Sequence, residues 1–465
     1  MTRIEKDSLG PLEIPSEVYY GIQTHRAILN FPVSGLRAHP RFVDAYVMLK
    51  KAAAIANAKS GELSTSMRDA IVKACDEILG GAFRDQFPVD VFQMGAGTAF
   101  NMNINEVISN RANEILGHKK GEYSPVNPND HANMAQSTND TFPSAMRVAL
   151  LLVLKEFLHA PLEELEKSFV KKGKEFDGIL KSARTHLQDA VPIRLGQEFA
   201  AYGEAIRKSR LALLAAEKSL HELGLGGSAA GTGMNTPAGY REEVTREFSK
   251  LSGLSLVPAT DMREAMQSQR PMAEVSAALR NLSLEITRIV NDLRLLSSGP
   301  TTGLSEINLP AMAPGSSIMP GKVNPSVLEM VNMVAFHVIG SDTTVALAVQ
   351  AGQFELNVMM PVMAFELNFS VMILGNACKI LREKCVDGIT ANADRCRHYA
   401  DSSLGLATAL NTAIGYAKAA EVVKEALKSN KTLMQVIRDN KILSEEQIKK
   451  LMDPYKMTES GIPGK

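Results

Sequence analysis

The chain has 465 residues, more than one compact core usually holds, so two or three domains or one elongated bundle are expected. Lysine plus arginine equals aspartate plus glutamate at 51 each, so no net charge draws in nucleic acid or an acidic membrane surface. Aromatic residues make up 5% and tryptophan is absent, which disfavours base stacking. We therefore expect a small, locally recognised partner and no nucleic acid.

The cysteines and the start of the chain bear on where the protein works. Cys75, Cys378, Cys385 and Cys396 form neither a CxxC pair nor a zinc-ligand spacing, so we interpret them as reduced thiols and expect neither a metal nor another cofactor. No apolar signal-peptide core follows Met1, and no unbroken apolar stretch reaches transmembrane length. These features predict a cytoplasmic protein with no membrane partner.

Helical periodicity dominates the chain. Apolar residues recur at alternating spacings of three and four from Met272 to Leu296, which predicts a bundle helix about 40 Å long. Strand signals are few and short, so the predicted fold class is mainly α. Further helices are predicted, in chain order, over 145–159, 195–223, 241–251, 327–350 and 354–381, with short amphipathic helices beyond about residue 430.

Two of these helices, 327–350 and 354–381, are apolar on nearly every side. A helix that is hydrophobic all round is buried all round, which in a soluble chain places it at the centre of a large bundle or of an oligomer. The pattern therefore indicates assembly into an oligomer.

Breaks in the helical pattern suggest three domains. Residues 121–130 interrupt the chain before the long helices, and residues 387–392 interrupt it after them. We predict an N-terminal, mainly helical domain (1–140), a central long-helix bundle (141–395) and a small C-terminal helical domain (396–465).

The most informative stretch is residues 315–325 (GSSIMPGKVNP). It places two hydroxyls, an amine and an amide among glycines and prolines, and surrounds them with Ile318, Met319 and Val323. Glycine allows the backbone to approach a ligand closely, and proline keeps the segment out of a helix. A flexible linker has no use for apolar anchors, so we interpret this segment as an anion-binding loop.

Three earlier segments have the same polar character. Residues 95–98 (GAGT) precede a run of amides, and residues 133–140 (NMAQSTND) hold a succession of hydroxyls and amides. Residues 184–189 (RTHLQD) place a histidine among partners able to fix its tautomer. Helix capping accounts for one or two of these polar groups but not for all of them, so the segments are candidates for ligand binding.

Together, and in this order, the four segments resemble the site segments of the aspartase/fumarase superfamily, whose signature the 315–325 loop resembles. The resemblance extends from residues 19–24 (YYGIQT) to residues 352–358 (GQFELNV), so it covers nearly the whole chain. It implies a mainly α, three-domain fold with a central long-helix bundle. It also implies a homotetramer in which each active site draws segments from three subunits, with a small dicarboxylate, L-aspartate or fumarate, as substrate.

Small differences favour the aspartase branch of this superfamily. Residues 95–98 and 136–138 (QST) are similar to the aspartase forms, whereas class II fumarases usually carry serine after the first glycine and a second serine after Gln-Ser. Residues 139–143 (NDTFP) suit a fumarase equally. The resemblance therefore implies reversible deamination of L-aspartate to fumarate and ammonia. A class II fumarate hydratase, or a lyase for a related amino-dicarboxylate, is the alternative, and an inactive binding protein with the same fold is a third.

The resemblance also implies roles for individual residues. The base is Ser316, which removes a proton from the carbon beside the side-chain carboxylate and so gives an aci-carboxylate; His186 is the second candidate catalytic residue. A serine hydroxyl is a weak base, so we expect backbone amides and Lys322 to lower its pKa. By this resemblance Thr98, Ser137, Thr138 and Ser317 hold the carboxylate that accumulates charge, Lys322 and Asn324 hold the other carboxylate, and Asn139, Thr185 and His186 surround the amino group.

Overall fold

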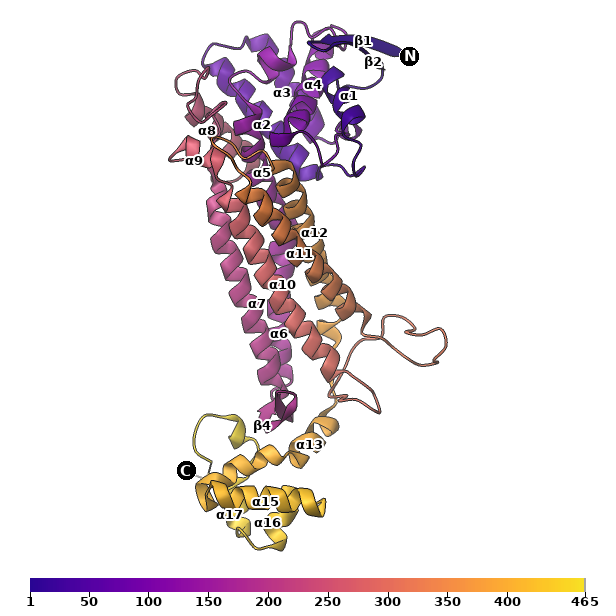
Figure 1. Ribbon diagram of the computed structural model, residues 1–465, viewed down its shortest axis with the longest axis vertical. Helices are drawn as coiled ribbons and strands as arrows, with labels where there is room; N and C mark the ends of the chain where they lie inside the picture. Colours follow the sequence, from indigo (N-terminus) through magenta and orange to yellow (C-terminus); the bar gives the residue numbers. More distant parts are fainter. Residues whose placement is uncertain (464–465) are drawn as a thin grey trace. The chain divides into compact units, whose positions relative to one another are not determined.

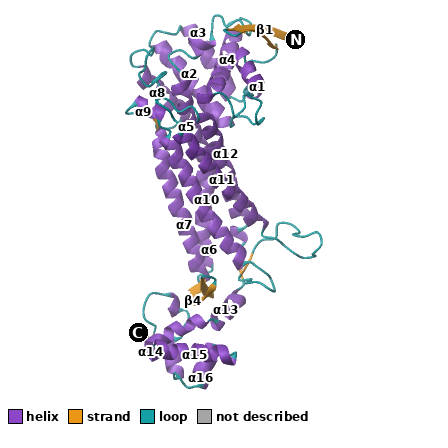
Figure 2. Ribbon diagram, in the orientation of Figure 1, coloured by secondary structure: helices purple, strands orange, loops and turns teal. Residues whose placement is uncertain are grey.

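The computed structural model describes residues 1–463, and helices make up most of them, as Figures 1 and 2 show. Strands pair only in two-stranded sheets within this part of the chain. The chain divides into two units. Unit 1 comprises Met1–Ala160, Leu211–Ser283 and Phe336–Gly375, and unit 2 comprises Pro161–Arg210, Leu284–Ala335 and Asn376–Lys465. The predicted domain boundaries near residues 140 and 395 stay predictions.

Unit 1 begins with a β-hairpin, in which β1 (Thr2–Asp7) pairs antiparallel with β2 (Gly10–Pro15). A short parallel pair, β5 (Glu222–Leu223) and β6 (Val257–Pro258), belongs to the same unit. The helices that lie wholly within unit 1 are α1 (Ile22–Asn30), α2 (Pro40–Lys59), α3 (Thr65–Leu79), α4 (Thr98–Ile115), α5 (Thr138–Val153), α8 (Tyr240–Ser252) and α9 (Met262–Gln267). Helix α2 lies at the centre of this group, because it packs against α3, α5 and α8.

Aromatic rings fix α2, α4 and α5 against one another. The ring of Phe42 in α2 stacks on Phe100 of α4 with centroids 5.0 Å apart, and it meets Phe142 of α5 edge-on at the same separation. All three side chains are buried. Such pairs add to the burial of apolar surface, so the first turns of α4 and α5 are held in a fixed relation.

Five long helices contribute residues to both units: α6 (His159–Glu175), α7 (Leu195–Glu217), α10 (Arg270–Leu296), α11 (Ser326–Gln350) and α12 (Met360–Lys384). Within unit 2, Tyr202 of α7 packs on Phe169 of α6, with ring centroids 5.9 Å apart, and donates a hydrogen bond to Asp292 of α10. Within unit 1, Ser341 of α11 donates to Glu366 of α12. Within unit 2, α6, α7 and α10 therefore pack against one another, and within unit 1 α11 packs against α12.

The predicted helices are present, although several begin or end at other residues than predicted. The helix predicted from residue 354 begins at Met360, because the side chain of Asn357 accepts a hydrogen bond from the Met359 amide and holds the preceding turn. The helix predicted from 145 begins at Thr138, where Ser137 and Asp140 form a capping box. The helix predicted over 195–223 ends at Glu217 and continues as a short 3₁₀ turn and strand β5.

The two apolar helices are only partly covered by this chain. On α11, Met333 is 65% exposed, Phe336 58% and Leu347 57%, so the described residues leave much of its apolar surface open. By length and composition alone, Ser326–Gln350 and Met360–Gly388 pass as membrane spans, a test that core helices of soluble proteins also pass.

In unit 2, β3 (Leu180–Thr185) and β4 (Gln188–Arg194) form an antiparallel hairpin. Its outer strand is held by the C-terminal part of the chain: Ser403 donates to the Ala190 carbonyl, and Arg194 donates to the Thr458 hydroxyl. The remaining elements of this unit are β7 (Ile307–Asn308), β8 (Thr390–Ala391), α13 (Ala393–Ser402), α14 (Asn411–Ile414), α15 (Tyr416–Ser429), α16 (Leu433–Asp439) and α17 (Glu445–Leu451).

Candidate functional site

The first turns of α4 and α5 lie against each other. Thr98 is the first residue of α4 and Thr138 the first residue of α5. One turn into α4, the side-chain amide of Asn101 donates to the Thr138 hydroxyl at 3.0 Å. Gly97, with φ of 82°, lies so close to the ring of Phe142 that only glycine fits there. The structure thus brings together Thr98 and the residues around Thr138.

Two helix N-termini at one place favour an anion. Each first turn leaves backbone N–H groups without helical partners, and the helix dipole adds partial positive charge there. The Ser137 hydroxyl caps α5 by accepting from the Asn139 amide at 3.2 Å, and the Thr138 hydroxyl oxygen accepts from Asn101. A hydroxyl whose oxygen accepts a hydrogen bond still has its own proton to donate, so both residues are able to donate to a carboxylate.

Asn139 and Thr98 are also free to meet a ligand. The side-chain amide of Asn139 donates to the Ala229 carbonyl at 2.9 Å, which leaves its oxygen as an acceptor suited to an ammonium group. Within residues 1–463 the Thr98 hydroxyl has no hydrogen-bond partner. The turn before it is positioned by the segment 352–358, because the Ala96 amide donates to the Val358 carbonyl at 2.7 Å.

Two buried titratable residues, Lys50 and Asp140, adjoin this group, and the sequence patterns did not single them out. Lys50 of α2 donates to Asn133 and Gln136, both at 2.9 Å. Asp140 accepts from the backbone amides of Gly226 and Ser228. Burial raises the pKa of Asp140 to about 6 and lowers the pKa of Lys50 to about 7. The available signal was a lysine pair inside an otherwise apolar stretch of α2.

Thr185 and His186 lie at the tip of the β3–β4 hairpin. Thr185 pairs with Gln188, so the turn consists of His186 and Leu187, with φ of 56° and 59°. Two positive φ values define a type I′ turn, which favours Asn and Gly. Non-glycine residues in this region carry backbone strain, which clusters at functional sites. The imidazole has no hydrogen-bond partner among residues 1–463, so the flanking side chains do not fix its tautomer as expected.

The base of the same hairpin is a buried ionic cluster. Glu306 is fully buried and binds Arg184 at 2.9 Å and Lys181 at 3.1 Å, and Lys181 also binds Glu198 at 2.8 Å. A buried carboxylate is strongly destabilising when its cationic partners move away, because its charge is then uncompensated. The cluster therefore holds the strand that leads to Thr185 in a fixed position.

The 315–325 loop closes on itself at its neck. The Gly315 amide donates to the Lys322 carbonyl at 2.7 Å, and the Asn324 side chain donates to the Gly315 carbonyl at 2.8 Å. A Cβ atom on Gly315 would lie 2.6 Å from the Asn324 nitrogen, so this closure requires glycine. The ends of the loop are thus anchored, while Ser317 and Lys322 are exposed.

Inside the loop, the Ser316 hydroxyl receives two backbone donors. The amides of Met319 and Ile318 donate to its oxygen at 3.0 and 3.3 Å. Donors aimed at a hydroxyl oxygen stabilise its deprotonated form. The Lys322 ammonium has no ion-pair partner among the described residues, so it is available to a carboxylate.

The predicted residues therefore form three separate groups. Unit 1 holds the α4–α5 group, whose members the structure brings together: Thr98, Ser137, Thr138 and Asn139. Unit 2 holds the hairpin tip and the loop, and no hydrogen bond links these two within the described part of the chain. No three side chains of His, Cys, Asp or Glu in residues 1–463 are grouped as metal ligands.

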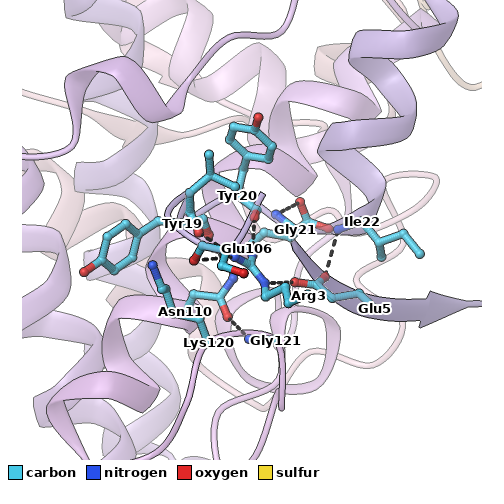
Figure 3. A network of polar contacts seen from close by, with 12 residues as sticks. Arg3, Glu5, Tyr19, Tyr20, Gly21, Ile22, Glu106, Asn110, Lys120 and Gly121 are labelled. Atoms are coloured by element: carbon cyan, nitrogen blue, oxygen red, sulfur yellow. Dashed lines mark hydrogen bonds and ion pairs between the residues drawn. The ribbon is translucent and has the colours of Figure 1, made fainter. Parts of the chain in front are cut away.

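The segment 19–24 supports α4 rather than forming part of a site. Figure 3 shows the first turn of α1 directed at Glu106 of α4, which accepts from the amides of Gly21 and Gln23 at 2.8 and 2.9 Å. Glu5 of β1 accepts in the same way from the Ile22 amide at 2.9 Å. A buried carboxylate at a helix N-terminus fixes the helix in place, so these contacts tie α1 to α4.

Family comparison assigns the chain to a class. Residues 10–340 match the family described as "Lyase", and residues 406–459 match the family described as "Fumarase C C-terminus". The chain therefore belongs to this lyase family and is an enzyme of the aspartase/fumarase superfamily, which confirms the resemblance and the mainly α fold expected from it.

Individual relatives include an aspartate ammonia-lyase and a class II fumarase. The aspartate ammonia-lyase of Bacillus subtilis is 46% identical over 463 residues, covering 100% of this chain and 97% of the relative. The crystal structure of a cobalt-bound fumarate lyase/delta crystallin from Brucella melitensis superposes with a TM-score of 0.96 at 47% identity, over 99% and 100% of the two chains. A class II fumarase from Schistosoma mansoni superposes with the same TM-score at 35% identity, over 98% and 99%.

Proposed function

We propose that the protein is an aspartate ammonia-lyase, a carbon–nitrogen lyase that converts L-aspartate reversibly to fumarate and ammonia. The observation that carries this proposal is the meeting of two helix N-termini with the hydroxyls of Thr98, Ser137 and Thr138, a site suited to a carboxylate. Full-length similarity at 46% identity to a protein of that name supports the amino-dicarboxylate. The more distant similarity to a fumarase keeps fumarate hydratase as the alternative.

In the proposed reaction Ser316 acts as the base. Its oxygen takes a proton from the carbon beside the side-chain carboxylate, and the electron pair moves into that carboxylate to give the doubly charged aci-carboxylate. The two amides that donate to Ser316 favour its alkoxide form, and Lys322 adds positive charge in the same loop. The intermediate collapses by breaking the bond between carbon and nitrogen, which releases ammonia.

The neutral donors supply the main stabilisation of that intermediate. Hydroxyls of Thr98, Ser137 and Thr138, joined by Ser317 of the loop, would hold the carboxylate that accumulates charge. Fixed dipoles stabilise developing charge without having to reorganise. In many enzymes this electrostatic stabilisation makes the largest contribution to the rate enhancement. Lys322 and Asn324 would hold the other carboxylate, while Asn139, Thr185 and His186 would surround the amino group.

We also propose that the enzyme is a cytoplasmic homotetramer with shared active sites. The open apolar surface of α11, with Phe336 58% exposed, supports burial against other copies of the chain. Assembly would let segments from three subunits complete each site, so the three groups of residues need not meet within one chain. The division into three domains at residues 140 and 395 is part of this proposal.

One assay tests the activity. Purified protein is given L-aspartate, then L-malate, and the ultraviolet absorbance of fumarate is followed, with ammonia measured in parallel. Fumarate and ammonia in equal amounts from L-aspartate support the proposal. Fumarate from L-malate alone identifies a fumarate hydratase, and no product from either substrate favours the inactive binding protein.

A further inference from the structure

Lys50 is a buried lysine to which the proposed reaction gives no role. It lies in α2 with 1% of its surface exposed, among Tyr46, Cys75 and Asp140. Lysine is almost never fully buried unless it is paired, because taking its amine out of water is unfavourable. An apolar side chain of similar length would fill the same volume, so packing alone does not explain the amine.

The hydrogen bonds of Lys50 lead to the hydroxyl of Thr138. Lys50 donates to the side-chain oxygen of Asn133 at 2.9 Å, and the same oxygen accepts from Asn101 at 3.3 Å and from Asn105 at 3.2 Å. The Asn101 amide donates in turn to Thr138 at 3.0 Å. Three donors on one oxygen fix the orientation of Asn133, and through it the direction of the Asn101 amide.

A second contact fixes the turn before Ser137. Lys50 donates to the side-chain oxygen of Gln136 at 2.9 Å, which leaves the Gln136 amide to donate to the carbonyls of Met134 at 3.0 Å and Ala132 at 3.2 Å. The turn contains Ala135 at φ of 60°, a conformation that needs support from its surroundings. Lys50 therefore holds the segment before α5 at two points, Asn133 and Gln136.

We propose that Lys50 is a positioning residue, which acts through Asn133 and Asn101 to aim the hydroxyl of Thr138 at the carboxylate that accumulates charge in the transition state. This inference rests on the proposed function for its substrate. Either protonation state of the Lys50 amine donates the two hydrogen bonds, so the role requires the amine and not a fixed charge. Misdirected donors would stabilise the transition state less while substrate still binds.

The first test is the kinetics of Lys50→Met with L-aspartate. We expect kcat to fall about 100-fold, with KM changed less than about threefold, because the lost stabilisation belongs to the transition state. Lys59→Met, on the same helix with a 63% exposed side chain, is the matched control and should keep wild-type kcat. Circular dichroism and size-exclusion chromatography establish that each variant is folded and assembled.

A double-mutant cycle with Thr138→Ala separates positioning from a general structural role. If Lys50 acts through Thr138, adding Lys50→Met to Thr138→Ala lowers kcat by less than about threefold further, whereas independent effects multiply. The proposal is overturned if the double variant loses the product of the two single kcat losses. It is also overturned if Lys50→Met keeps the wild-type kcat. Where Lys50→Met does not fold, Lys50→Gln is used in the same cycle, and failure of both to fold shows a purely structural lysine and also overturns it.

The outcome for the wild-type protein keeps the two proposals apart. Wild-type protein without activity on L-aspartate contradicts the proposed function. Active wild-type protein with independent effects in the cycle contradicts only the role of Lys50.

Discussion

A Cβ atom on Gly97 would lie 2.0 Å from a ring carbon of Phe142, so the backbone before α4 rests directly on the second turn of α5. This contact places Thr98 beside Thr138, and nothing larger than a hydrogen atom fits at the point of contact. The proposed carboxylate site therefore depends on a backbone approach that the side chains of the site do not themselves provide.

Gly97→Ala should separate the two helix starts. The methyl group must push α4 away from Phe142, and the φ of 82° is unfavourable for alanine, so we expect a loss of about 2 kcal/mol or more in unfolding free energy. The kcat of the protein that remains folded should also fall, because Thr98 and Thr138 no longer lie together. Gly117→Ala is the matched control, because Gly117 has φ of 87° but no atom within 4 Å of its added Cβ. Equal losses in both variants would show that the ring contact is unimportant.

Ser316→Ala should abolish turnover while the protein still binds substrate and assembles. The base is removed, but the Gly315–Lys322 and Gly315–Asn324 hydrogen bonds that close the loop remain. We expect kcat to fall by about 1,000-fold or more, with binding of fumarate measured by calorimetry nearly unchanged. Ser429→Ala, at an exposed position near the end of α15, serves as the control. A near-normal rate would remove Ser316 as the base.

Leu187→Gly should stabilise the protein. Leu187 occupies a position with φ of 59° in a type I′ turn, which glycine adopts without strain, so unfolding free energy should rise by about 0.5 to 1 kcal/mol. Leu9→Gly makes the same change in another exposed hairpin turn, where Leu9 has no positive φ, and it should destabilise instead. Thermal unfolding of the two variants measures the difference, and a lower melting temperature for Leu187→Gly would contradict the assignment of strain.

Lys50 should make stability depend on pH in the alkaline range. Burial lowers its folded pKa to about 7, whereas the unfolded chain keeps the proton up to about 10.5; the nearby Asp140 and Cys75 oppose this lowering. Between these pH values the unfolded state binds more protons, so this residue makes the free energy of unfolding rise with pH. The rise should be smaller in Lys50→Met, measured by urea unfolding between about pH 7 and pH 10 at one protein concentration. If the free energy of unfolding depended on pH in the same way in wild-type protein and in Lys50→Met, this prediction would be contradicted.

Long periodic helices and polar segments were predictable from the sequence. The helix α10 keeps alternating spacings of three and four through its length, and it was predicted to within two residues of Arg270–Leu296. The segments around Thr98 and Thr138 were recognisable because they hold more polar residues than capping requires. Such local patterns depend only on neighbours in the chain, which a sequence displays directly.

Contacts between distant segments were not predictable in the same way. The bond from Lys50 to Asn133 joins residues 83 positions apart and exists only because α2 packs beside α5. The His186–Leu187 turn contains neither Asn nor Gly, so its φ values of 56° and 59° contradict the usual turn signal. The cap at Asn357, which delays α12 to Met360, likewise depends on a single side chain.

Thr138 and Ser316 belong to different units of the chain. If each active site of the proposed homotetramer takes these two residues from different subunits, two impaired variants need not be impaired together. When subunits carrying Thr138→Ala are mixed with subunits carrying Ser316→Ala and allowed to exchange, some hybrid tetramers contain a site with both residues intact. Recovery of activity above that of either impaired protein, a form of complementation between alleles, is the genetic consequence of this division.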